Sequence, residues 1–230
     1  MTTHDIRREA VLGGRYRIVG DPEERHHFAL FPAKRADGVL YERDYTVLVI
    51  DEWINREPGT RDRFTRLVRR PAPELEGRVT TPVDMDVDNE RQHAWVAFET
   101  PWGETLDART VAALLPLDDV RDALLTLASS LALVHDAGLV AEPSPENVWF
   151  GRKEGGLAVV TILVPGLVPL IRGARSTDTR VGPMEPVFSL SFLAPEVITG
   201  QIEGTPADVW TFALLAFELF TGASYWETVR

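Results

Sequence analysis

The side chains best suited to chemistry are a carboxylate and an amide in one predicted loop, Glu142 and Asn147 of AEPSPENVWF. A carboxylate can act as a general base, and an amide oxygen can bind a hard cation such as magnesium. Because no anionic partner is predicted for Asn147, we expect its side chain to bond the backbone of its own loop. Glu142 is either a residual catalytic base or an exposed loop carboxylate.

A helix before this loop and two strands after it must position these side chains. Apolar residues repeat along one helical face over 118–137, and Gly138 supplies a left-handed stop, so the sequence predicts a helix there. That face is formed by Val120, Leu124, Leu127, Leu131 and Val134. Strands are predicted in NVWF at Asn147 and in AVVTILV at Ala158.

The last predicted element is an apolar helix that starts in TPADVW and ends at Gly222. Thr205, Pro206 and Asp208 suit an N-cap, a first-turn proline and a capping-box acid. Apolar side chains surround its axis, so we expect this helix to be buried on all sides.

The first half of the chain predicts a small sheet with one short helix. β-like runs begin at Tyr16, His27, Tyr45 and His93. A helix over 62–70 is predicted from Phe64, Leu67 and Val68, and the prolines that follow stop it.

Composition narrows the classes of function. With no cysteine and five scattered histidines, the chain is not expected to form disulfides, thiolate metal sites or a zinc site. A net charge of -11 disfavours nucleic-acid binding, and the arginine-rich run 56–70 is interpreted as a solvated helix face. No signal segment or membrane span is predicted, so a cytoplasmic location is expected.

Four strings, in order, resemble the protein kinase superfamily. HDAGLVAEPSPENVWF resembles the catalytic loop, and VVTILVPGLV resembles the strand that leads into D-F-G. SFLAPEVITG contains A-P-E, and TPADVWTFALLAFELFTG resembles the central helix of the large lobe. The resemblance spans 14–222, and the preference for arginine over lysine suits a bacterial Ser/Thr-kinase-like protein.

This resemblance implies an α+β, bilobal protein-kinase-like fold. The expected parts are an N-terminal tail over 1–13, a β-rich N-lobe over 14–103 and a mainly helical partial C-lobe over 104–230, truncated after the central helix. The resemblance also implies that Asp208 ties the central helix to the catalytic loop, and that Glu196 lacks the arginine that usually pairs with it. We therefore expect Asn147, Glu196 and Asp208 to have structural roles.

Residues needed for phosphoryl transfer are replaced at the matching positions. The catalytic aspartate falls at Glu142, or equally at Pro143 because the loop is one residue shorter than the family pattern. The remaining degenerate positions are Leu48 for the third-strand lysine, Leu67 for its glutamate partner, Ser144 for the catalytic-loop lysine and Val164 for the D-F-G aspartate. The phosphate loop maps onto GDPEERHHF, which has one glycine and several acids, and Lys34 is interpreted as a solvated turn residue.

From these replacements we predict a degenerate member, or pseudokinase, that is not an enzyme and has no cofactor. The predicted function is a scaffold or allosteric regulator in signalling that binds a true kinase, a regulatory domain or a second copy. Its interface is expected to include Trp210, Phe217 and Phe220. The alternatives are a sensor that binds ATP without magnesium and an enzyme with chemistry centred on Glu142 and Asn147. A loop with Ser176, Thr177 and Thr179 is either phosphorylated or simply flexible and polar.

Overall fold

The structure is a computed structural model that describes residues 6–25, 28–36, 43–51, 59–68, 75–88, 93–108, 114–167, 170, 190–199 and 204–228. The chain divides into two compact units, each described by itself. One comprises Met1–Pro71, Thr81–Thr100 and Leu170–Val187, and the other comprises Ala72–Thr80, Pro101–Pro169 and Phe188–Arg230. The domain limits predicted from the sequence remain a prediction.

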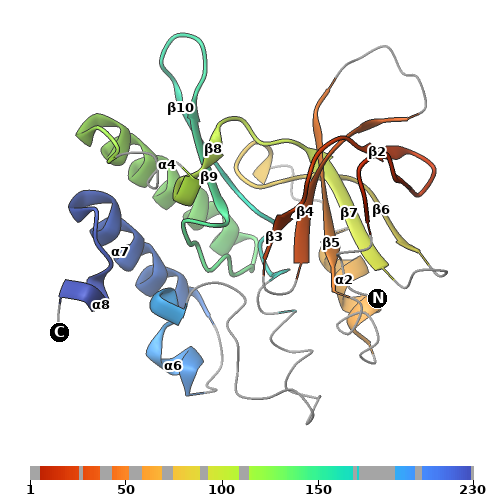
Figure 1. The fold of residues 1–230 in the computed structure, drawn as a ribbon. Coiled ribbons are helices and arrows are strands. Elements are labelled where there is room, and N and C mark those ends of the chain that lie inside the picture. The colour runs from red at the N-terminus through yellow and green to blue at the C-terminus, as the bar shows by residue number, and fades with distance from the viewer. Residues whose placement is uncertain are drawn as a thin grey trace. The chain divides into compact units, whose positions relative to one another are not determined.

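The first unit is built on an antiparallel sheet, and its described residues form seven strands (Figure 1). The strands are β1 (Val11–Leu12), β2 (Tyr16–Ile18), β3 (Glu23–Glu24), β4 (Phe28–Arg35), β5 (Tyr45–Ile50), β6 (Pro82–Asp88) and β7 (His93–Glu99). Their order is β1-β2-β4-β5-β7-β6, and β3 pairs with β4. The four strands predicted for this half are therefore present.

Strand β6 was missed because its sequence, PVDMDVD, alternates aspartate with apolar residues. Aspartate is depleted in strands, so the segment does not have the composition of one. Among the described residues it pairs with β7 alone and so lies at an edge of the sheet, where charged side chains are tolerated.

The core of the first unit gathers large side chains on one face of the sheet. Trp95 on β7 and Tyr16 on β2 are fully buried, and their rings meet edge to face at 5.7 Å between centroids. Leu12 and Phe31 lie in the same cluster. Helix α2 (Thr60–Val68) buries Phe64 and leaves Leu67 half-buried, as the predicted spacing requires.

The second unit is mainly helical and carries a three-stranded sheet in the order β10-β9-β8. Its elements are β8 (Glu104–Thr105), α4 (Leu117–Asp136), β9 (Val148–Arg152), β10 (Ala158–Ile162), a 3-10 turn η3 (Leu190–Phe192), α6 (Pro195–Ile198), α7 (Thr205–Thr221) and α8 (Tyr225–Thr228). Helices α4 and α7 contact one another (Figure 1). The α+β class predicted from the sequence is confirmed.

Helix α4 buries the predicted apolar face. Its buried residues include all five members of that face: Val120, Leu124, Leu127, Leu131 and Val134. Gly138 follows with φ 68° and closes the helix in the left-handed conformation that glycine adopts without steric cost.

Helix α7 differs from its prediction in two ways. It buries one stripe, Ala207, Asp208, Thr211, Leu215 and Leu219, and is not buried on all sides. Val209 and Phe220 are 62% and 56% exposed. The N-cap is Gly204, and no side chain caps the helix, so the predicted capping roles of Thr205 and Asp208 are wrong. None of the helices within the described ranges is long and apolar enough to cross a membrane.

Candidate functional site

The candidate site is the loop 141–147, which lies between α4 and β9 in the chain. Asp208 of α7 holds this loop through hydrogen bonds to its backbone. The carboxylate of Asp208 is fully buried. Its Oδ2 accepts the backbone N–H of Ala141 at 2.9 Å, and its Oδ1 accepts the N–H of Glu142 at 2.6 Å. This is the link between the central helix and the loop that the kinase resemblance implied.

A histidine that the sequence did not indicate completes this anchor. His135, in the last turn of α4, places Nε2 2.8 Å from Oδ2 of Asp208. Asp208 therefore has three hydrogen-bonding partners, which is how a buried carboxylate is compensated for the loss of water. These contacts use both carboxylate oxygens and explain why Asp208 does not cap its own helix.

The amide of Asn147 braces the loop from inside. Its Oδ1 accepts the N–H of Ser144 at 2.7 Å, and its Nδ2 donates to the carbonyl oxygen of Glu142 at 3.0 Å. Both ends of the side chain thus bond loop backbone, as expected from the sequence. In the structure this amide therefore stabilises the turn at 142–147, and we call it the turn brace.

Glu142 and Ser144 are both buried. Glu142 is 4% exposed, so its interpretation as an exposed loop carboxylate is wrong, and its backbone is left-handed with φ 47°. Such a conformation is uncommon outside glycine, asparagine and aspartate, and the bond from the Glu142 N–H to Asp208 holds it. Ser144 is 1% exposed, and its Oγ has no hydrogen-bond partner among the described residues.

Val164, at the position of the D-F-G aspartate, lies in a buried turn just after β10. Its backbone is left-handed with φ 23°. Its N–H donates to Oγ1 of Thr80 at 2.9 Å. A valine side chain has no oxygen to offer a hard cation. Where the structure describes side chains, no group of three or more His, Asp or Glu could hold a metal ion.

The positions that match the phosphate-binding ion pair lie in the first unit. Leu48 on β5 is fully buried and stands opposite Leu30 and Val96 in the sheet. Leu67 on α2 is half-buried, and Lys34 on β4 is exposed. Leu48 and Leu67 thus place hydrocarbon side chains where the kinase pattern has the lysine and its glutamate partner.

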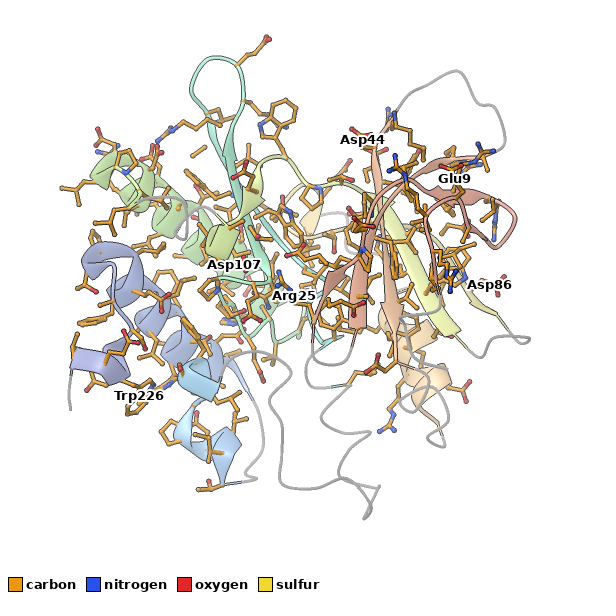
Figure 2. The ribbon with its side chains drawn as sticks, viewed as in Figure 1. Glu9, Arg25, Asp44, Asp86, Asp107 and Trp226 are labelled. Carbon is orange, nitrogen blue, oxygen red and sulfur yellow. The ribbon has the colours of Figure 1, made fainter. Side chains whose placement is uncertain are left out.

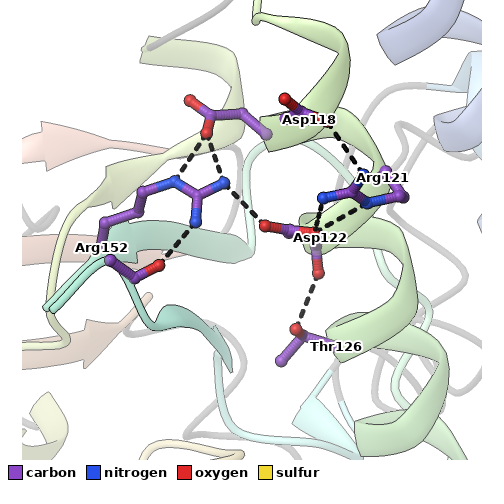
Figure 3. Close-up of polar contacts among 7 residues, drawn as sticks. Asp118, Arg121, Asp122, Thr126 and Arg152 are labelled. Atoms are coloured by element: carbon purple, nitrogen blue, oxygen red, sulfur yellow. Dashed lines mark hydrogen bonds and ion pairs between the residues drawn. The ribbon is translucent and has the colours of Figure 1, made fainter.

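A cluster of charges fixes the β9–β10 hairpin to α4 (Figure 3). The guanidinium of Arg152 donates from Nε to Asp119 at 2.7 Å and from an Nη atom to Asp122 at 2.8 Å. It also donates to the carbonyl oxygen of Gly156 at 2.7 Å. The hydrogen bond from Arg152, followed by one from Arg121, holds the pKa of Asp122 below its usual range. In the sequence, only the spacing of Asp119 and Asp122, three residues apart on a predicted helix, indicated this cluster.

The predicted interface residues all lie on α7 but differ in exposure. Phe220 is 56% exposed, whereas Trp210 and Phe217 are half-buried. The ring of Phe217 meets that of Tyr225 edge to face, and Tyr225 meets Trp226 in the same way. Trp226, labelled on α8 in Figure 2, donates its indole N–H to the carbonyl oxygen of Ser191 at 2.8 Å.

Two further predictions from the sequence concern the segment around α6. Glu196 is half-buried on α6, and no ion pair of its carboxylate is found among the residues that the structure describes. The candidate phosphorylation sites Ser176, Thr177 and Thr179 lie outside the described residues.

Comparison with known proteins identifies relatives among the protein kinases. No protein-family profile matches the chain. Ribosomal protein S6 kinase alpha-2 of Mus musculus is 24% identical over 139 residues, which are 60% of this chain and 18% of that protein. Serine/threonine-protein kinase ppk21 of Schizosaccharomyces pombe is 26% identical over 128 residues, 54% of this chain and 22% of that protein. The chain thus spans about a fifth of the length of these curated relatives.

Solved structures agree with this result. A double mutant of the Mycobacterium tuberculosis PknI kinase domain superposes with a TM-score of 0.69 at 19% identity, covering 95% of this chain and 77% of that one. Rad53 residues 1–466, in complex with AMP-PNP, superposes with a TM-score of 0.65 at 15% identity, covering 91% of this chain and 49% of that one. At these identities the likeness establishes the fold.

The prediction that the chain is not an enzyme is contradicted by these comparisons. The curated relatives are named as kinases, and kinases are enzymes. The prediction rested on replaced side chains alone, and the buried positions of Glu142 and Val164 do not demonstrate inactivity. What the strings, the loop anchored by Asp208 and the superpositions establish together is that this chain has a protein-kinase-like fold.

Proposed function

We propose that this kinase-like domain works in signalling as a scaffold or allosteric partner, and that it binds another protein through one exposed face of α7 and α8. We define this α7–α8 face by its exposed and half-exposed apolar residues, Val209, Trp210, Phe217, Phe220, Tyr225 and Trp226. The observation that carries the proposal is the exposure of Phe220 and Trp226, at 56% and 42%. Apolar side chains that are exposed and cluster, as Phe217, Tyr225 and Trp226 do, are typical of interaction sites.

The aromatic side chains of this face are held in fixed positions. Tyr225 lies edge to face between Phe217 and Trp226, with centroid distances of 5.5 and 5.2 Å. The hydrogen bond from the Trp226 indole to the carbonyl oxygen of Ser191 fixes the Trp226 ring. Aromatic residues that are ordered before binding lose little conformational entropy on association, so they make efficient contacts. The proposed partners are a true kinase, a regulatory domain or a second copy of the chain.

Size-exclusion chromatography with light scattering tests the second-copy form of this proposal. We expect self-association at micromolar concentration that Phe220→Ser abolishes. Leu157→Ser is the matched control because Leu157 is 66% exposed on the β9–β10 hairpin, away from α7 and α8 in the chain. If the chain is a monomer, affinity capture from the native host must retain an identified kinase or regulatory domain and lose it with Phe220→Ser. A monomer that retains neither contradicts the proposal.

The second candidate function is a nucleotide sensor that binds ATP without magnesium. It is supported by Val164, whose hydrocarbon side chain stands where the kinase pattern has a metal-binding aspartate. Thermal-shift measurements with ATP, with and without magnesium, test it. An equal stabilisation in both conditions supports the sensor, and no shift in either argues against it.

Phosphotransfer must be measured beside these binding assays because the relatives are named as kinases. Radiolabelled ATP and a general protein substrate provide the assay. Transfer that is lost in Glu142→Gln but retained in Glu154→Gln would assign it to the site, since Glu154 is an exposed hairpin residue. That outcome would replace the binding proposal with an enzymatic one.

A further inference from the structure

The turn that follows β10 contains a backbone conformation that valine does not favour. Val164 has φ 23°, in the left-handed region, and it is 5% exposed. A β-branched residue with positive φ is an outlier, because its branched side chain clashes with the backbone in that region. Strain of this kind persists only where the surrounding structure imposes it.

Backbone contacts fix the residues on each side of Val164. The N–H of Leu163 donates to the carbonyl oxygen of Asn147 at 2.9 Å. The N–H of Gly166 donates to the carbonyl oxygen of Val140 at 2.7 Å, and the N–H of Leu167 closes the turn on the carbonyl oxygen of Val164 at 3.0 Å. Val164 must therefore join two anchored peptides, and the left-handed conformation does so.

The amide of Val164 itself is bound by a side chain from a distant part of the sequence. Oγ1 of Thr80 accepts this N–H at 2.9 Å across 84 residues, and the contact is buried. Thr80 is 5% exposed, so water does not readily replace its hydroxyl. An amide left without an acceptor in such a place loses its bond to water without a replacement, so removal of the hydroxyl is costly.

Thr80 is in turn held in place by β10. Its N–H donates to the carbonyl oxygen of Ile162 at 2.9 Å, and the N–H of Ile162 donates to the carbonyl oxygen of Arg78 at 2.9 Å. Val79 and Ile162 form a parallel bridge between these bonds. Segment 75–80 is thus a turn whose last two residues pair with β10, and Oγ1 of Thr80 at its end accepts the N–H of Val164 in the strained turn.

We propose that Thr80 and Val164 form a strained clamp, in which the Thr80 hydroxyl holds residues 163–167 in their left-handed turn. Segment 75–80 then sets the conformation of this turn, because without the hydroxyl the buried amide of Val164 has no acceptor. Loss of the clamp allows Val164 to relax toward an extended conformation, at the expense of the bonds from Gly166 and Leu167. The clamp is independent of the function proposed above.

Four variants of the full chain test the clamp by amide hydrogen exchange, resolved by residue with NMR. Thr80→Val removes the acceptor with little change of shape, and Thr80→Ser keeps a hydroxyl. Val164→Gly removes the strain, because glycine adopts positive φ freely. The fourth variant combines Thr80→Val with Val164→Gly. Thr211→Val is the matched control, since Thr211 is buried and its hydroxyl bonds the carbonyl oxygen of Asp208.

We expect Thr80→Val to speed exchange at Val164, Gly166 and Leu167 by about tenfold, the scale of one buried hydrogen bond, while amides within β10 stay protected. Thr80→Ser should change these rates by less than about threefold, and Thr211→Val should leave them unchanged. In the Val164→Gly background the effect of Thr80→Val should shrink to about threefold or less, because the two residues are energetically coupled.

Three results overturn the clamp. They are equal acceleration in both backgrounds, a Thr80→Ser variant that behaves like Thr80→Val, and uniform acceleration throughout the second unit. If Thr80→Val does not fold, the double variant decides: Val164→Gly with Thr80→Val added should fold, because the strain that the Thr80 hydroxyl opposes is then absent. A double variant that also fails to fold contradicts the clamp.

Discussion

The carboxylate of Asp208 accepts the backbone N–H of Glu142 at 2.6 Å, although 66 residues separate them in the sequence. A hydrogen bond to a buried charge contributes about 1.5–3 kcal/mol, which offsets the cost of about 1–2 kcal/mol for the left-handed conformation of Glu142. The central helix therefore fixes the shape of the loop through its backbone. The side chains on the loop are free to change without loss of this anchor.

Asp208→Asn tests this anchor. The variant keeps the size of the side chain but replaces one acceptor oxygen with an amide that faces a donor, either an N–H of the loop or His135. We expect the free energy of unfolding to fall by about 3 kcal/mol, as when one partner of a buried charged contact is removed. Urea denaturation provides the measurement. Asp136→Asn, on an exposed residue of α4, should change stability by less than about 0.5 kcal/mol, and an equal effect of the two variants would contradict the anchoring role of Asp208.

Local sequence patterns predicted the elements around the site because those patterns repeat over short distances. The apolar face of α4 recurs every three or four residues, and the strands of the first unit are β-branched and aromatic. Asn147 and Ser144 are three residues apart, so the bond between the Asn147 side chain and its own loop could also be predicted from the local sequence.

Contacts between segments that are distant in the sequence could not be predicted from local patterns. His135 and Asp208 are 73 residues apart, and Thr80 and Val164 are 84 apart, and neither pair has a local motif. The composition of α7 predicted burial on every side, but a helix is buried only where other elements pack on it, and here one stripe is covered. One of the two interpretations of Glu142, an exposed loop carboxylate, followed from its charge alone, whereas its place in the loop buries it.

Gly103→Ala should strongly destabilise the second unit. Gly103 has φ 96°, and a Cβ there would lie 2.2 Å from the carbonyl oxygen of Phe150, which is backbone and cannot move aside alone. We expect a loss of about 3 kcal/mol from the clash and the unfavourable φ combined. Gly155→Ala is the control, because Gly155 has φ 83° but open space around it, so only about 1 kcal/mol should be lost. Thermal or urea unfolding measures the loss of stability in each variant. Equal losses in Gly103→Ala and Gly155→Ala would show that the positive φ, and not the clash, accounts for the effect.

Asp122→Asn should destabilise the protein in a pH-dependent manner. The folded pKa of Asp122 lies below its ordinary value of 3.8, first because of the hydrogen bond from Arg152 and then because of the one from Arg121. Ionised Asp122 therefore stabilises the folded state above pH 3.8, and this contribution is lost as the pH falls through the lower folded pKa. The melting temperature of the variant should be below that of the wild type at pH 7, and the difference should shrink in acid. A difference that persists unchanged in acid contradicts the ion-pair explanation.

Glu218→Gln should stabilise the protein at neutral pH, in contrast to Asp122→Asn. Glu218 lies in the last turns of α7, where a carboxylate is unfavourable. Partial burial, followed by the charge of Glu227 on α8, raises the pKa of Glu218 above its ordinary value of 4.5. The C-terminal end of a helix also carries a partial negative charge, and the last turn of α7 has no basic residue to balance it. The folded state thus binds the Glu218 proton more tightly than the unfolded state does, so stability falls as the pH rises from 4.5 through the folded pKa.

At pH 7 the glutamine variant should therefore melt at a higher temperature than the wild type, and below pH 4.5 the gain should disappear because Glu218 is then protonated in both states. Glu227→Gln removes only the second cause of the raised pKa and should give a smaller rise at pH 7. Differential scanning calorimetry of the three proteins across this pH range measures both effects. A glutamine variant that is less stable than the wild type at pH 7 would mean that the Glu218 carboxylate makes a favourable contact that outweighs its burial.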